Sequence, residues 1–304
     1  MPRLPQIDTT IPRLIAVMGS TGCGKTEVAE ALAEHLGAQL INADAFQVYR
    51  GMDIGTAKPG RKHLYRLLDL KAPNEGFGVG ELVQLAGSEL IQLFEKGCSA
   101  IVVGGTGLYI RALFEQYADL AASPDPGLRS ELMERENREG LAVLAEELRQ
   151  RAPAVAERTD LANPVRVRRA LERLSTSGAV VSSKLPPFSQ TKLVLQRDKT
   201  ELNSFIEIRM HAMVQNGWLE EVDSLKRSGY GPGDPGFRAL GYTALWQHLA
   251  GTVAMKDALE STVLETRRYA KRQRSWLRSE PNALPIFGDS APELISAAIG
   301  TLFP

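Results

Sequence analysis

The sequence lacks a hydrophobic run long enough to cross a membrane, and its N-terminal segment MPRLPQIDTTIPR contains no apolar signal-peptide core. Only two cysteines are present, Cys23 and Cys98, and their separation does not match a metal-binding motif. Lys plus Arg number 36 and Asp plus Glu number 36, so the net charge of zero does not imply a nucleic-acid partner. We therefore expect a cytoplasmic protein without a membrane partner, in which any nucleic-acid contact needs a local basic patch.

The first 120 residues alternate between strand and helix patterns. A length of 304 residues, with 43% hydrophobic and 24% charged residues, is ordinary for one globular domain plus an insertion. Apolar runs predict strands at 14–18, 39–44, 67–70 and 100–103, and helical periodicity predicts helices at 26–36, 79–96 and from 107 onward. This alternation is typical of a parallel sheet with helices on both faces.

The pattern changes after residue 120. Residues 121–183 contain no convincing strand and are dense in Glu and Arg, which indicates a helical insertion. Lys192 to Leu195 returns to a strand pattern, and everything after it is mostly helical. We therefore predict an α/β core of residues 1–120 and 184–304, with an inserted all-helical lobe at 121–183.

Residues 19–26, GSTGCGKT, fit the phosphate-binding pattern G-x-x-x-x-G-K-[ST] between a predicted strand and a predicted helix. Glycines allow several backbone N–H groups to point at one anion, and the helix N-terminus and Lys25 add positive charge. The hydroxyl of Thr26 suits Mg²⁺. The alternative, a Gly-rich turn with a surface lysine, is disfavoured by the strand–loop–helix context. The loop makes the predicted α/β core P-loop NTPase-like. It predicts bound phosphates without saying which molecule carries them.

Polar residues follow two more predicted strands, and ligands of open parallel sheets bind beyond the carboxyl ends of the strands. Asp44 closes the second strand, where it either binds Mg²⁺ or accepts a proton, or else caps a helix or forms a turn. Thr106 follows two glycines and precedes a helix, so it is an N-cap, a hydroxyl aimed at a bridging or leaving oxygen, or both. We expect both residues to converge with the phosphate loop at one edge.

Two absences narrow the function. The strand predicted at 100–103 ends in IVVGG rather than in an acidic residue, and the sequence contains no N-K-x-D element that would read guanine. A motor ATPase or a GTPase is therefore weakly supported. A small-molecule kinase, or a group transferase that uses a diphosphate, fits better.

Two basic stripes supply the local positive charge. Asn163 and Pro164 predict an N-cap and a first-turn proline of a helix that carries arginines at 166, 168, 169 and 173. Near the C-terminus, ETRRYAKRQRSWLR carries six basic residues and one acid. Its Tyr269 and Trp276 either pack into the core or stack on bases. Each stripe alone fits a solvated helix face. Two stripes nearly free of compensating acids favour a phosphate-backbone partner.

These motifs resemble, in order along nearly the whole chain, the tRNA dimethylallyltransferase family, also called tRNA isopentenyltransferases. The segments that carry the resemblance are GSTGCGKT (19–26), DAFQVYRGMDIGTAKP (44–59), VGGTGLYIRAL (103–113), NPVRVRRALE (163–172), RMHAMVQNGWLEEV (209–222), FRALGY (237–242) and RYAKRQRSWLR (268–278). The segment from Gln47 to Pro59 is much more specific than a phosphate loop alone.

The resemblance implies transfer of the dimethylallyl group from dimethylallyl diphosphate to the exocyclic amine of the adenine 3′ of the anticodon, in tRNAs that read codons beginning with U. It implies that Asp44 is the general base and that Thr106 and Arg209 lie near the diphosphate bridging oxygen. The implied diphosphate cradle, with Mg²⁺ at Thr26, consists of Gly19, Ser20, Thr21, Gly22, Cys23, Gly24, Lys25 and Thr26. The implied tRNA contacts are Asp44, Ala45, Phe46, Gln47, Thr106, Val165, Arg166, Val167, Arg168, Arg169, Phe237, Arg238, Ala239, Leu240, Gly241 and Tyr242.

The chain departs from the common family pattern at three positions. Ser20 stands where proline is usual, and Cys23 and Ala45 stand where serines are usual. The first two changes keep small side chains in the loop, while Ala45 removes a hydroxyl near the acceptor. Alternative functions are a small-molecule P-loop kinase and an adenylate isopentenyltransferase acting on free nucleotides. We expect a monomer.

Overall fold

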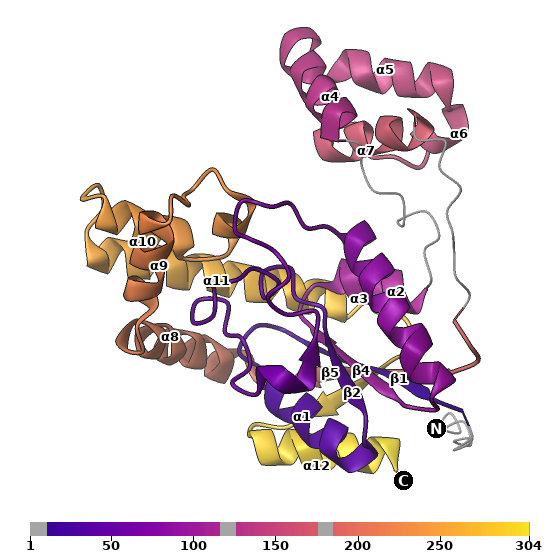
Figure 1. Cartoon of the computed structure of the whole chain (residues 1–304), viewed down its shortest axis with the longest axis vertical. Helices are drawn as coiled ribbons and strands as arrows, with labels where there is room; N and C mark the ends of the chain where they lie inside the picture. The colour runs from indigo at the N-terminus through magenta and orange to yellow at the C-terminus, as the bar shows by residue number, and fades with distance from the viewer. Residues whose placement is uncertain (1–10, 116–125, 176–184, 304) are drawn as a thin grey trace. The chain divides into compact units, whose positions relative to one another are not determined.

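The computed structural model describes residues 11–115, 126–175 and 185–303 and separates into two compact units (Figure 1). One unit combines residues 1–116 with 184–304, and the other consists of residues 117–183. In the described part of the chain, no helix combines the length and apolar character that spanning a membrane requires.

The first unit is built on a six-stranded sheet whose order is β3-β2-β4-β1-β5-β6, with every pair parallel. The strands are β1 (Arg13–Gly19), β2 (Gln39–Asn42), β3 (Tyr65–Arg66), β4 (Ala100–Gly104), β5 (Ser189–Gln196) and β6 (Ala283–Phe287). β1 lies between β4 and β5, so the loop that follows β1 emerges at the centre of the carboxyl edge. The predicted parallel sheet flanked by helices is confirmed.

Helices cover both faces of the sheet (Figure 1). Ile15 and Val17 of β1 pack with α1 (Lys25–Leu36) and α12 (Ala291–Leu302). The alternate residues Leu14, Ala16 and Met18 pack on the other face, with α2 (Val79–Glu95) and α3 (Gly107–Phe114). Because successive side chains of a strand point to opposite faces, a strand buried on both faces must be apolar throughout, which explains the continuous run in β1.

A third core joins the C-terminal helices to the loop after β2. The helices are α8 (Lys199–Gln215), α9 (Trp218–Arg227), α10 (Tyr242–Leu249) and α11 (Met255–Leu277). Val48, Tyr49 and Met52 of the loop are buried among them. Trp218 and Tyr242 meet edge to face with ring centroids 5.8 Å apart. The loop after β2 is therefore held by a hydrophobic cluster of its own.

The second unit is helical where the structure describes it, with α4 (Pro126–Glu139), α5 (Leu141–Arg151), α6 (Pro153–Ala156) and α7 (Pro164–Ser175). It has a separate core in which Leu132, Leu144 and Val167 are buried. As predicted, Asn163 caps α7, because its Oδ1 accepts hydrogen bonds from the N–H groups of Val165 and Arg166 at 3.1 and 3.2 Å.

One strand prediction was wrong, and one strand was missed. The strand expected at 67–70 lies instead at Tyr65–Arg66, because Leu67 and Asp69 adopt positive φ angles of 65° and 54° and end the extended run. The C-terminal segment is mostly helical, as predicted, but it also contributes β6, which pairs with β5 at the sheet edge. β6 is only five residues long, contains Pro285 and lies between helices, so it carries a weak strand pattern.

Candidate active site

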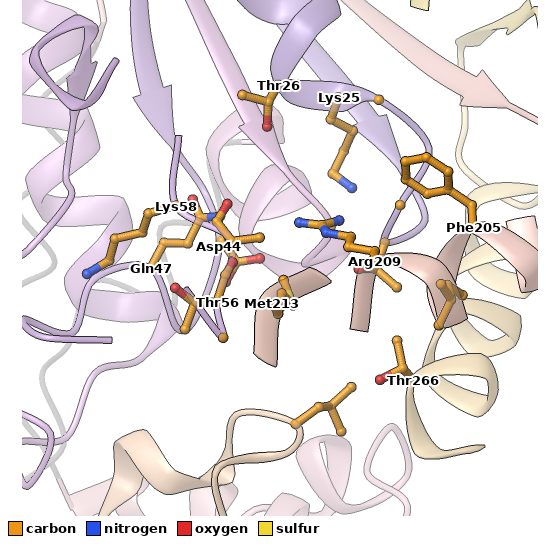
Figure 2. Close-up of a pocket in the computed structure, with 18 of the residues that line it drawn as sticks. Lys25, Thr26, Asp44, Gln47, Thr56, Lys58, Phe205, Arg209, Met213 and Thr266 are labelled. Atoms are coloured by element: carbon orange, nitrogen blue, oxygen red, sulfur yellow. Dashed lines mark hydrogen bonds between the residues drawn. The ribbon is translucent and has the colours of Figure 1, made fainter. Parts of the chain in front are cut away.

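One cavity of about 640 Å³ lies at the carboxyl edge of the sheet (Figure 2). Its wall combines the phosphate loop, Asp44 after β2 and Gly105 after β4. Residues 55–60, α8 and α11 complete it. The phosphate loop and Asp44 therefore meet in the first unit as expected, while the end of β4 contributes Gly105 to the lining rather than Thr106.

The phosphate loop turns through two glycines in the left-handed region, Gly22 at φ 81° and Gly24 at φ 94°. Among the described residues, their N–H groups have no backbone acceptor. The first-turn N–H groups of α1 also lack partners within the helix. Cys23 is buried, and burial raises the pKa of its thiol, so it serves here as a small apolar residue. The loop thus presents unpaired donors at the positive end of a helix, as an anion requires.

Lys25 and Arg209 bring positive charge to the cavity, and Figure 2 shows both side chains extending into it. Lys25 donates to the carbonyl of Ser20 at 2.8 Å. Within the described part of the chain, Arg209 has no ion-pair partner. Burial lowers the pKa of Arg209, and the negative charges of Glu27 and Asp44 act in the opposite direction. A half-buried, unpaired guanidinium is costly unless an anion joins it.

Asp44 is both a turn former and a cavity residue. Its Oδ1 accepts a hydrogen bond from the N–H of Phe46 at 2.9 Å, and its own N–H donates to Asn42 at 3.1 Å. The other oxygen, Oδ2, makes no hydrogen bond to any described residue. The turn therefore fixes the carboxylate through one oxygen and leaves the other available in the cavity (Figure 2).

Thr106 begins α3 as the predicted N-cap residue, although its side chain makes no capping hydrogen bond. It lies just outside the cavity lining, beside Tyr269, which is part of the lining. Burial, and then the charge of Asp44, raise the pKa of the Tyr269 phenol, while hydrogen bonds with Thr106 and Gln273 lower it. The Thr106 hydroxyl is therefore linked through a neutral phenol to the environment of Asp44.

Gln273 joins the phosphate loop to the loop after β4. It is 4% exposed, and its Oε1 accepts from the N–H of Thr21 at 2.8 Å, while its Nε2 donates to the carbonyl of Gly105 at 3.0 Å. A buried amide with both ends satisfied fixes the two backbones relative to each other. Glycine at 105 leaves room for this amide, because a Cβ there would lie 2.3 Å from Nε2 and would displace the Gln273 side chain.

The wall formed by residues 47–60 is anchored from two sides. Gln47 donates to the carbonyls of Thr56 and Ala57, both at 3.1 Å, which closes the loop on itself. Glu221 of α9 accepts hydrogen bonds from three successive backbone N–H groups, those of residues 53, 54 and 55, at 2.6, 2.7 and 3.2 Å. It also accepts from the Tyr242 hydroxyl at 2.6 Å. The loop is therefore preorganised rather than free.

Lys58 lines the cavity with its stem but directs its ammonium group into this loop. The side chain is fully buried, and Nζ pairs with Asp53 at 2.7 Å and with Asp69. Lys62 pairs with the same two carboxylates at 2.6 and 3.2 Å. The charge of Lys58 is thus compensated within the protein, unlike that of Arg209.

The segment from Phe237 to Tyr242, predicted to contact tRNA, contains both buried and accessible side chains. Phe237, Ala239 and Tyr242 are buried in the third core, and Gly241 has a positive φ of 87°. Arg238 is exposed and Leu240 lines the cavity. Only these last two side chains of the segment present an accessible surface. Phe46 and Ala45 are partly buried on the neighbouring loop.

The arginines of α7 are better compensated than the sequence indicated. Arg168 pairs with Glu136 of α4, Arg166 lies 3.7 Å from Asp160, and Arg169 lies 3.2 Å from Glu172. The expectation of a stripe nearly free of acids was wrong, because two of these acids come from other segments of the unit. Val167 is buried, Val165 is 63% exposed, and the side chain of Arg166 remains 65% exposed.

Three residues of the site lie outside the sequence-based prediction: Gln273 and Arg197 line the cavity, and Glu221 anchors its wall. Gln273 and Glu221 act across more than 160 positions of sequence, so local pattern does not reveal them. Arg197 directly follows β5, and the strand-end reasoning that identified Asp44 also applies to it.

Carboxylate clusters do not provide a ready metal centre. Among the described residues, no group of three or more His, Cys, Asp and Glu side chains could hold a metal ion. Thr21, Thr26, Glu27 and Asp44 are oxygen-bearing side chains at the phosphate-loop end of the cavity. This donor set suits a cation that keeps most of its ligands from substrate phosphates and water, as Mg²⁺ does.

Comparison with known proteins agrees with this geometry. Residues 47–280 match the model of the family described as "IPP transferase". The chain belongs to the IPP transferase family. Residues 12–68 also match the model described as "Isopentenyl transferase". The predicted family resemblance is confirmed.

Relatives of this family match most of the chain. A tRNA dimethylallyltransferase of Gloeobacter violaceus is 39% identical over 278 residues, 89% of this chain and 90% of that protein. One from Geobacter sulfurreducens is 38% identical over 285 residues, 88% of this chain and 90% of that protein. The crystal structure of a tRNA isopentenylpyrophosphate transferase from Bacillus halodurans has a TM-score of 0.69 at 31% identity and covers 95% of both chains.

Proposed function

We propose that this IPP transferase family member transfers a dimethylallyl group from dimethylallyl diphosphate to the exocyclic amine of the adenine 3′ of the anticodon, in tRNAs that read codons beginning with U. The observation that carries the proposal is the meeting of a phosphate loop, an unpaired Arg209 and the Asp44 carboxylate in one cavity. The phosphate loop and Arg209 suit the diphosphate of the donor, and the Asp44 carboxylate suits the amine of the acceptor.

The phosphate loop and Arg209 bind the diphosphate of the donor. The amides of Gly22 and Gly24, together with Lys25, supply hydrogen bonds and charge to its oxygens. Prenyltransferases generally use a divalent metal ion, and we propose Mg²⁺, held by Thr26 and the donor phosphates. When bound, Mg²⁺ neutralises part of the charge that develops on the diphosphate.

Asp44 acts as the general base. The exocyclic amine of adenine is a weak nucleophile because its lone pair is delocalised into the ring. As the bond from this nitrogen to the first carbon of the dimethylallyl group forms, the carbon–oxygen bond to the diphosphate breaks and its electron pair leaves with the diphosphate. The free Oδ2 of Asp44 accepts the proton from the nitrogen.

Thr106 and Arg209 stabilise the leaving group where the negative charge develops. Thr106 stands at the N-terminus of α3 beside Tyr269, and Tyr269 lines the cavity into which Arg209 extends from α8 (Figure 2). The half-buried position of Arg209 strengthens its electrostatic effect, because less water screens the charge.

The acceptor adenine must leave its stack to reach a carboxylate inside a cavity. On the core unit, Gln47, Arg238 and Leu240 offer accessible side chains for the anticodon loop. On the helical unit, the exposed Arg166 at the start of α7 offers a phosphate contact. We propose that the helical insertion binds tRNA through this end of α7.

Transfer of radiolabelled dimethylallyl from its diphosphate tests the proposal, with tRNA and AMP compared as acceptors. Label in tRNA and not in AMP is the expected result. Label in AMP alone would identify an adenylate isopentenyltransferase. Release of ADP from ATP with a small alcohol, without label transfer, would identify a kinase. Neither alternative is favoured, because the relatives matched over 88–89% of the chain are tRNA dimethylallyltransferases.

A further inference from the structure

Arg197 occupies the strand end on the far side of the phosphate loop from Asp44. It directly follows β5, which pairs with β1 in a register that sets Leu195 beside Gly19, the first residue of the phosphate loop. Asp44 follows β2. The strand order β2-β4-β1-β5 places three intervals between them, or about 14 Å at the usual spacing of parallel strands. The phosphate loop therefore lies between Asp44 and Arg197.

No carboxylate or hydrogen-bond acceptor among the described residues pairs with the Arg197 guanidinium. Its Nε is buried without a hydrogen bond, and within the described residues the side chain makes no ion pair. Buried polar groups are normally paired, and a cationic one strongly so. Because Arg197 also lines the cavity, the missing partner is an anion that enters the cavity.

Phe205 holds this guanidinium in place. The guanidinium carbon lies 5.6 Å from the centroid of the Phe205 ring, and the ring itself is 43% exposed at the cavity wall. Stacking on an aromatic face orients a planar guanidinium while leaving its edge N–H groups free. Arg197 is therefore preorganised to bind a planar or tetrahedral oxyanion beside the phosphate loop.

The two unpaired arginines of the cavity have different electrostatic surroundings. Glu27, Cys23 and, more weakly, Asp44 act on the charge of Arg209, whereas Arg197 acts on Cys23 inside the phosphate loop and on Glu293 of α12. Both arginines therefore face the phosphate loop, and Asp44 belongs to the surroundings of Arg209. The strand order sets Arg197 three strand intervals away from Asp44, at the other end of the site. The two ends of the donor diphosphate also differ, because one phosphate is bonded to the transferred carbon and the other is terminal.

We propose that Arg197 binds the terminal phosphate of the diphosphate donor, stacked on Phe205, while Arg209 acts at the phosphate that carries the transferred carbon. This inference rests on the proposed function. Because the terminal phosphate is bound equally before and during bond breaking, Arg197 contributes uniform binding of substrate and transition state. It is a donor-binding residue and not part of the proton transfer.

The test measures binding of inorganic pyrophosphate, with Mg²⁺ present, to the whole chain by calorimetry, and steady-state transfer to tRNA. In Arg197→Gln we expect pyrophosphate affinity to fall at least tenfold and KM for dimethylallyl diphosphate to rise by a similar factor. We expect kcat to stay within about threefold. Arg209→Gln should instead lower kcat. The matched control is Arg227→Gln, which changes an arginine of α9 that is 73% exposed, paired with Asp223 and absent from the cavity lining.

The outcomes separate the inference from the proposed function. Equal pyrophosphate affinity in wild type and Arg197→Gln overturns the role of Arg197 and leaves the prenyl transfer intact. Absence of pyrophosphate binding by wild type overturns the proposed function itself. If Arg197→Gln unfolds, Arg197→Met replaces it, since methionine keeps an apolar stem against Phe205 without the charge; unchanged affinity in that variant also overturns the inference.

Discussion

At the scale of single residues, Asp44 illustrates how one carboxylate serves structure and chemistry together. Its Oδ1 holds the turn through the Phe46 N–H at 2.9 Å, so the second oxygen is oriented without a competing hydrogen bond. The turn requires an oxygen acceptor but not a charge, because asparagine forms the same turn. The two roles can therefore be separated by a conservative substitution.

We expect Asp44→Asn to lower kcat by about 10² to 10⁴, the usual contribution of a general base, while the fold and tRNA affinity are retained. The amide keeps an oxygen for the Phe46 N–H but cannot accept the proton from the adenine amine. Transfer assays under saturating tRNA measure the effect, with Asp289→Asn as an exposed control outside the cavity lining. Near-normal turnover in Asp44→Asn would contradict the general-base role.

Asp44, Lys25 and Thr106 were predictable because their positions follow from local pattern. Each follows a strand or opens a helix within a few residues, and the parallel sheet brings such ends together. Gln273 and Glu221 were not predictable in this way, because their hydrogen bonds join segments far apart in sequence. The predicted roles of the site residues remain predictions.

At the scale of elements, α9 determines the shape of the cavity wall through Glu221. Three backbone N–H groups of residues 53–55 and the Tyr242 hydroxyl converge on this carboxylate. Gly55 also packs so closely on Trp218 that a Cβ would lie 2.0 Å from the indole nitrogen. The loop and the helix therefore form a single folded element in which neither side can shift alone.

Replacing Glu221 by Gln should destabilise the protein by about 2–3 kcal/mol, because the new NH₂ group faces backbone donors and the hydrogen bonds lose their charge assistance. Chemical denaturation measures the loss. Glu220→Gln, on the same helix, is the control, since no hydrogen bond or ion pair of Glu220 is found among the described residues. A loss below about 0.5 kcal/mol would mean that the loop holds its shape without this anchor.

The helical unit should lose stability in acid through Glu172 of α7. Burial opposes ionisation of this side chain, but Arg129 at 2.9 Å and Arg169 at 3.2 Å outweigh it and lower its pKa. A depressed folded-state pKa means that the stabilisation is complete above the unfolded value of about 4.3 and is lost as pH falls through the lower folded value.

Comparing pH-dependent unfolding of wild type and Glu172→Gln tests whether this stabilisation is lost as pH falls. The difference in unfolding free energy should be largest above about pH 5 and should shrink on acidification, because the amide carries no charge to lose. Glu134→Gln on α4 serves as the control, because Glu134 is exposed and has no ion-pair partner within 4.0 Å among the described residues. A difference that is constant with pH would show that Glu172 acts by packing alone.

At the scale of the whole molecule, a net charge of zero makes tRNA binding depend on where the charges are exposed. Most arginines of α7 are paired within the helical unit, whereas the Arg166 side chain is 65% exposed and lies 3.7 Å from an Asp160 oxygen. Exposed ion pairs of this length contribute little to stability, so such an arginine can exchange its partner for a phosphate.

We expect Arg166→Ala to weaken tRNA binding and to reduce the slope of log K against log salt concentration by about one, as the loss of one phosphate contact predicts. Filter binding across a salt series measures both quantities. Arg138→Ala on α4 is the control, because its side chain is similarly exposed at 68% but pairs with Glu139. An unchanged salt slope would show that Arg166 makes no phosphate contact and that this face of α7 is simply solvated.

The fold class and family were accessible from the sequence because they rest on motifs that keep their order along the chain. The two edge strands of the sheet, β3 and β6, were not accessible from the sequence. β6 is a short strand whose place depends on pairing with β5, and β3 is limited by positive φ angles at Leu67 and Asp69 that no apolar pattern reveals. The charge compensation of α7 was also hidden, since two of its acids, Asp160 and Glu136, belong to other segments.

The position of the helical unit in the chain has a further consequence. It is inserted in the crossover between β4 and β5, two strands that both pair with β1 and not with each other. Since the unit has its own hydrophobic core, neither β1 nor its two neighbours needs it to complete their pairing. The length and surface of the helical unit can therefore change, by divergence or by design, without altering the strand pairing that positions the residues at the strand ends.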